Sequence, residues 1–107
     1  MKAADVDRII EYLRQVRKRP KMYLSKVDAS AALNFLWGFK TACHALGYEV
    51  PLGIRERVCV EHGWQWSAHS PELEMKKHGL ADEAIVNELL AMAIAEWQHI
   101  GHNSVEE

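Results

Sequence analysis

The sequence has few of the residues that interrupt helices or cross-link loops. Its 107 residues include three prolines, six glycines and two cysteines, a composition that argues against a disordered or loop-dominated chain. No apolar run approaches the length needed to cross a bilayer. The acids Asp5 and Asp7, without a long apolar segment, argue against a signal peptide. We therefore expect one cytoplasmic domain, residues 1–107, with reduced thiols.

Charge is distributed unevenly along the chain, although apolar and charged contents of 49% and 26% are ordinary. Residues 1–26 contain eight Lys/Arg and three Asp/Glu, a net charge of +5, whereas residues 27–107 contain five and twelve, a net charge of −7. The acidic part could steer the protein to a basic partner. An ordinary solvated surface with charges clustered by chance is the alternative interpretation.

Residues 5–18 have the periodicity of an amphipathic helix. Pro20 is expected to end this helix, because a residue before proline, here Arg19, is biased away from helical dihedral angles. Residues 21–27 are then predicted to be a short extended connection whose Met22, Tyr23 and Leu24 pack onto the core. The apolar stripe of the helix consists of Val6, Ile9, Ile10, Leu13 and Val16.

A second helix is predicted to begin near Asp28 or Ser30, both good N-caps. It should run to about Leu46, because Gly47 favours a helix stop. Its apolar residues surround it on almost all sides, which predicts the central helix of a bundle, with Gly38 against a close neighbour. These residues are Leu33, Phe35, Leu36, Trp37, Phe39, Cys43 and Leu46, of which Trp37 and Cys43 are assigned to the core.

The middle of the chain is less regular. Residues 48–53 are predicted to be a loop and residues 54–63 a short helix ending at Gly63, although the alternation in residues 57–61 would also fit a strand. A loop from Trp64 should lead to another short helix. This helix would be capped by Ser70, would begin with Pro71 and would run through His78 to a stop at Gly79.

The last predicted helix runs from about Ala81 to His99. Its apolar stripe includes a core Trp97, and Gly101 favours a stop. Together these segments predict an all-α fold, a compact bundle of four to five helices.

Residue pairs that could suggest a metal or catalytic site lack the required partners. The pairs are Cys59/His62, Cys43/His44 and His99/His102, and none repeats with the spacing of a structural zinc site. There is no glycine-rich phosphate loop. We therefore expect no catalytic residue, no metal and no cofactor, and assign the protein to a non-enzymatic class.

Residues 14–21 form a basic run that suggests phosphate contacts, with Arg14, Arg17, Lys18, Arg19 and Lys21. The cations are too few for a convincing nucleic-acid footprint, and only Tyr23 adds an aromatic ring nearby. A solvated helix end paired with the protein's own acids is the preferred interpretation. A small nucleic-acid-binding regulator that uses residues 14–21 is the alternative.

Residues 17–24 have the pattern Arg-x-Arg-Pro-x-Met-Tyr-Leu. This pattern resembles the start of the ATPase domain of DNA gyrase, but Phe39 and Cys43 fall where those ATPases have a catalytic Glu and a metal-binding Asn. The pattern also resembles small bacterial immunity proteins of polymorphic or contact-dependent toxin systems. That second resemblance continues through the apolar segment 35–39, Trp64 and the last helix, with Ser25 where the pattern usually has Gly.

The resemblance to immunity proteins implies a protein that neutralises a cognate toxin, possibly a nuclease, by binding it directly. Because nuclease toxins are commonly basic, an acidic surface would speed association. Trp64 and Trp66 would be aromatic anchors, with core packing as the alternative for both. The expected contact residues are Glu49, Glu56, Glu61, Trp64, Trp66, Glu72 and Glu74.

Overall fold

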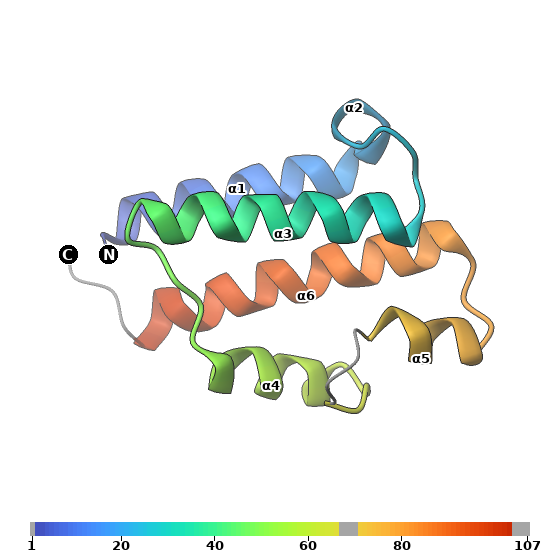
Figure 1. Ribbon diagram of the computed structural model, residues 1–107. Coiled ribbons are helices and arrows are strands. Elements are labelled where there is room, and N and C mark those ends of the chain that lie inside the picture. The colour runs from blue at the N-terminus through green and yellow to red at the C-terminus, as the bar shows by residue number, and fades with distance from the viewer. Residues whose placement is uncertain (1, 67–70, 104–107) are drawn as a thin grey trace.

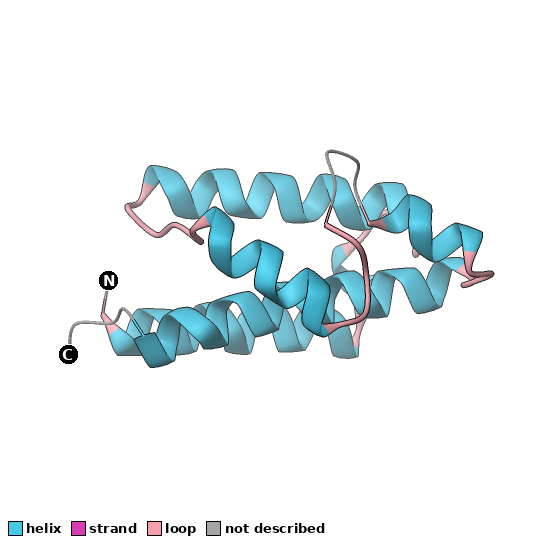
Figure 2. Ribbon diagram, turned by 90° about the horizontal axis from the view of Figure 1, so that it is seen from below, coloured by secondary structure: helices cyan, strands magenta, loops and turns pink. Residues whose placement is uncertain are grey.

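The computed structural model describes residues 2–66 and 71–103, which form helices and loops and no strand (Figure 2). The predicted all-α bundle is confirmed, and residues 54–63 are helical rather than extended. Four helices of ten or more residues build the bundle, and two shorter ones connect them. The helices are α1 (Ala3–Lys18), α2 (Pro20–Tyr23), α3 (Ala29–Ala45), α4 (Leu52–Glu61), α5 (Glu72–Lys77) and α6 (Asp82–Asn103).

Helix α6 is the centre of the bundle. Helices α1, α3, α4 and α5 each pack against it, with α3 parallel to α6 and α1 and α4 antiparallel (Figure 1). Its Leu90, Trp97 and Ile100 are almost fully buried, which confirms the assignment of Trp97 to the core. Helix α1 contributes its predicted stripe, of which Val6, Ile10, Leu13 and Val16 are buried.

The prediction that the second helix is central was wrong. Trp37 of α3 is 75% exposed rather than in the core, and a Cβ at Gly38 would meet nothing within 4 Å. Other apolar residues of α3 are only half-buried against the core, namely Leu33, Phe35, Leu36 and Phe39. Cys43 does lie in the core, as predicted.

Helix ends follow the sequence signals closely at α3, α4 and α5. Asp28 caps α3, because its Oδ1 accepts a hydrogen bond from the Ala31 amide at 2.8 Å. The three helices end before Gly47, Gly63 and Gly79, which all have φ between 83° and 88°. In each case the glycine N–H and the next residue's N–H bond back to the last turn, the pattern of a Schellman cap. These three stops confirm the sequence predictions.

The connection after α1 differs from the predicted extended segment. Arg19 leaves the helical region as expected, but Pro20 then starts the single turn α2, a position that its fixed φ favours. Leu24 packs into the core, whereas Met22 is 69% exposed and Tyr23 is also exposed. The prediction that all three fold onto the core was therefore wrong for Met22 and Tyr23.

Helix α6 also continues past the stop that Gly101 suggested, to Asn103. Gly101 lies inside this helix next to α1, where an added Cβ would meet Val6 Cγ1 at 3.7 Å, so its low helix propensity does not end α6. Pro71 has helical dihedral angles, and its carbonyl accepts a hydrogen bond from Met75, near the predicted start of α5. The predicted cap Ser70 lies outside the described residues.

Truncating a core leucine of α6 should cost far more stability than truncating an exposed one. We expect Leu90→Ala to lower the free energy of unfolding by roughly 2–5 kcal/mol, because it removes buried methyl groups and leaves a cavity. The matched control is Leu46→Ala just after α3, where the side chain is 76% exposed. Urea unfolding followed by circular dichroism measures both, and equal losses would contradict the central position of α6.

Candidate binding pocket between α3, α4 and α6

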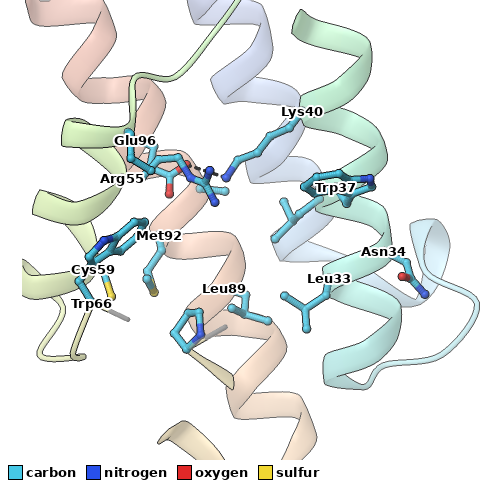
Figure 3. A pocket seen from close by; sticks show the side chains of 14 residues that line it. Leu33, Asn34, Trp37, Lys40, Arg55, Cys59, Trp66, Leu89, Met92 and Glu96 are labelled. Atoms are coloured by element: carbon cyan, nitrogen blue, oxygen red, sulfur yellow. Dashed lines mark ion pairs between the residues drawn. The ribbon is translucent and has the colours of Figure 1, made fainter. Parts of the chain in front are cut away.

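A pocket of about 630 Å³ opens where α3 and α4 lie on either side of α6. Leu89, Met92, Ala93 and Glu96 of α6 line it, with residues of α3 on one side and of α4 on the other (Figure 3). Its volume is in the range of small-molecule sites. Its lining residues are Leu33, Asn34, Leu36, Trp37, Lys40, Leu52, Arg55, Cys59, Trp66, Pro71, Leu89, Met92, Ala93 and Glu96.

Three charged side chains from three helices converge at one end of this pocket. Glu96 of α6 is only 6% exposed and is the one buried charged residue among those described. Lys40 of α3 places its Nζ 3.3 Å from Glu96 Oε1, and Arg55 of α4 extends toward the same point (Figure 3). The Arg55 Nε is buried and has no hydrogen-bond partner within the described part of the chain. We call Lys40, Arg55 and Glu96 the charged cluster.

Burial dominates the electrostatics of the charged cluster. It raises the pKa of Glu96 above its ordinary value, although Lys40 and Arg55 oppose this shift. It also lowers the pKa of Lys40, an effect that Glu96 opposes and the nearby Arg55 strengthens. Two cations thus lie beside one carboxylate, so the cluster has an excess of positive charge. Access of water to this site is restricted, so the charges are poorly solvated.

The rest of the pocket is mostly apolar. Leu33 and Leu89 lie toward the end away from the charged cluster, with Met92 on α6 between the two ends (Figure 3). Trp37 stands on the α3 side and Trp66 on the α4 side (Figure 3). Trp37, Leu52 and Trp66 are all exposed lining residues, and we call these three the apolar rim.

The predicted contact residues Glu49, Glu56 and Glu61 are exposed along α4 and the loop before it. Glu49 Oε1 lies 3.8 Å from His44 Nδ1, and Glu61 Oε1 lies 3.1 Å from His99 Nε2 on α6. These contacts are at the surface, so they leave the carboxylates accessible to solvent.

The other predicted contact residues are mostly more buried, and Glu74 and Trp64 contact other parts of the protein. Glu74 accepts a hydrogen bond from the Gln65 amide at 2.8 Å and thereby fastens the loop after α4 to α5. Glu72 is half-buried at the start of α5. Trp64 is half-buried, packs against the core and meets the His78 ring edge-on, at 5.7 Å between ring centroids. Of the two predicted anchors, Trp66 lines the pocket and Trp64 does not.

Two residues that were considered as a metal pair, Cys59 and His62, have other partners. His62 Nδ1 lies 2.6 Å from Glu88 Oε1, while Cys59 Sγ lies 3.6 Å from the carbonyls of Trp64 and Gln65. Burial raises the pKa of the Cys43 and Cys59 thiols. Among the side chains that the structure describes, in residues 2–66 and 71–101, no three His, Cys, Asp or Glu gather to hold a metal ion.

The basic run is exposed at the corner between α1 and α2. The prediction that the protein's own acids pair with it was wrong for the described residues, since no ion pair there involves any of its five cations. Arg17 instead donates a hydrogen bond from Nε to the Asn87 amide oxygen on α6, at 2.9 Å. The charges of this corner therefore remain available to a solution partner.

Sequence reasoning missed the charged cluster and the position of Trp37. One signal for Glu96 was available, because it occupies a position between Ala93 and Ile100 on the apolar stripe of α6. A charge on a core-facing stripe predicts buried partners. No comparable signal identifies Lys40 and Arg55, because their meeting depends on the arrangement of three helices.

Comparison of the chain with protein family models, with curated proteins and with solved structures gives no significant match. Among the described helices, none is both long enough and apolar enough to cross a membrane.

The raised pKa of Glu96 predicts a specific pH dependence of stability. Above pH 4.5 the carboxyl group ionises readily in the unfolded chain but resists ionisation when folded, so its contribution to stability falls as pH rises through the folded pKa. Relative to Glu96→Gln, the wild type should therefore lose stability between acid and neutral pH. Urea unfolding across this range measures the difference, with exposed Glu56→Gln as control. If the difference in unfolding free energy between the wild type and Glu96→Gln stayed constant with pH, the raised pKa of Glu96 would be contradicted.

Proposed function

We propose that this protein is a non-catalytic binding protein of the bacterial cytoplasm, an immunity protein that neutralises a cognate, basic protein toxin by direct binding. The observation that carries the proposal is the apolar rim. Trp37 is 75% and Leu52 62% exposed, and with Trp66 they surround one pocket. Large apolar side chains grouped at a concave surface favour a protein interface.

The geometry also supports an aromatic anchor at the rim. Trp37 belongs to α3, whose backbone is held by the Asp28 cap and by packing on α6. A tryptophan on a rigid helix loses little conformational entropy when a partner covers it, and such residues often dominate binding energies. Trp37 therefore joins Trp66 among the proposed contact residues, while Trp64 has a structural role.

Acidic residues would add speed and specificity rather than most of the affinity. Glu49, Glu56 and Glu61 are exposed near α4, and residues 27–107 have a net charge of −7. Such a surface would attract a basic toxin and would make association faster at low salt.

The toxin is expected to be the product of the gene immediately upstream. Expressed alone it should arrest growth, and co-expression with this protein should restore growth and allow the two proteins to be purified together. An upstream product that is harmless when expressed alone would contradict the proposal.

The apolar rim predicts which substitutions weaken the complex. Trp37→Ala should raise the dissociation constant by about 30-fold, the effect of losing a binding hot spot of about 2 kcal/mol. Leu52→Ala should act in the same direction, and isothermal titration calorimetry measures both. Leu46→Ala is the matched control, because Leu46 is the same residue type as Leu52 and at least as exposed, but lies outside the rim. If Leu46→Ala weakened binding as much as Leu52→Ala, the contact surface would lie elsewhere.

The unpaired basic corner favours a second candidate function, nucleic-acid binding through residues 14–21. Filter binding of duplex DNA separates the two candidates. A regulator would retain DNA at low salt and lose it steeply as salt rises, and neutralising Arg14 and Lys21 would reduce that salt dependence. We expect no such retention, because five clustered cations on a protein of net charge −2 form a small footprint.

A further inference from the structure

The charged cluster is unbalanced in a way that suggests a ligand. Lys40 and Arg55 carry two positive charges beside the single carboxylate of Glu96, which is only 6% exposed. The Arg55 Nε is a buried donor without an acceptor among the described residues. Glu96 Oε1, although 3.3 Å from Lys40 Nζ, also makes no hydrogen bond among the described residues, so it does not satisfy the Arg55 donor. Buried donors are normally satisfied, and the charged cluster has one more positive than negative charge, so the Arg55 Nε is free to donate to an anionic ligand.

The shape of the pocket indicates what else such a ligand would contain. The charged cluster occupies one end, while Leu33 and Leu89 lie toward the other (Figure 3). Leu89 and Glu96 are seven positions apart on α6, which corresponds to about 10 Å along the helix. A ligand that fills this length would have an apolar chain and a single charged end.

We propose that this pocket binds a small monocarboxylic acid with an apolar chain, the chemical class of medium-chain fatty acids. Its carboxylate lies between Lys40 and Arg55 and accepts the free Arg55 N–H, while its chain lies against Leu33, Met92 and Leu89. One negative charge balances the two cations and Glu96, whereas a phosphate dianion would leave excess negative charge next to a buried carboxylate. This site lies in the same pocket whose apolar rim is proposed to contact the toxin, but binding of the small acid is tested on this protein alone.

Decanoate is a suitable probe, and the methionines provide the readout. In protein labelled with 13C at the methionine methyl groups, the Met92 signal should shift saturably as decanoate is added, because Met92 lines the pocket. Met22, exposed at α2 and outside this pocket, should not shift. Decanol and decyltrimethylammonium have the same chain without the negative charge. We expect their affinity to be at least about tenfold lower than that of decanoate.

Arg55→Gln tests the charge of the pocket while leaving the Lys40–Glu96 ion pair in place. It should weaken decanoate binding about tenfold and should leave the affinity for decanol unchanged. Arg57→Gln is the matched control, because Arg57 lies on the same helix, is exposed and does not line the pocket. Circular dichroism melting establishes that each variant is folded.

Equal binding of decanoate and decanol to the wild type would overturn the proposal, since the pocket would then recognise only the apolar chain. This comparison requires no variant and holds even if Arg55→Gln does not fold. A shift of Met22 comparable to that of Met92 would also overturn it, because it would indicate general association with exposed apolar surface. All these outcomes are measured without a toxin, so failure of the proposed toxin interaction and failure of this proposal are separate results.

Discussion

Helix α6 has to be covered on several sides at once, and the rest of the fold follows from this constraint. Its buried residues face in several directions, so no single neighbouring helix can remove them all from water. Helix α1 covers one side, α3 another, and α4 and α5 the remainder (Figure 1). The loops that begin near Gly47 and Gly79 reverse the chain between α3 and α4 and between α5 and α6 (Figure 1).

Glu96 adds an electrostatic requirement to the packing of α6. A carboxylate on the buried side of α6 needs compensating charges, and the helices α3 and α4 that flank it supply them. Lys40 and Arg55 reach it from α3 and α4, so the flanking helices meet at that point through polar groups rather than through close apolar packing. The pocket lies where that apolar packing is incomplete.

Most of the fold could be predicted from local signals, and most of the site could not. Caps and stops such as Asp28 and Gly63 act within a few residues, so the sequence shows them directly. The central helix was misassigned because the apolar residues around α3 do not reveal which of them will be covered. Trp37 was placed in the core for that reason. The charged cluster joins positions 40, 55 and 96, and no local pattern links residues so far apart.

Stability alone is a weak reason for a protein to retain such a cluster. Replacing a buried ion pair by apolar residues of similar volume is often neutral or stabilising, because desolvation costs about as much as the charges regain. Apolar residues at positions 40, 55 and 96 would close the pocket and complete the cover of α6. The charged cluster instead keeps shifted pKa values and an unsatisfied donor at the end of an open apolar pocket. Perturbed groups in such a setting are more typical of binding sites than of structural cores, and this favours a functional reason for the incomplete packing between α3 and α4.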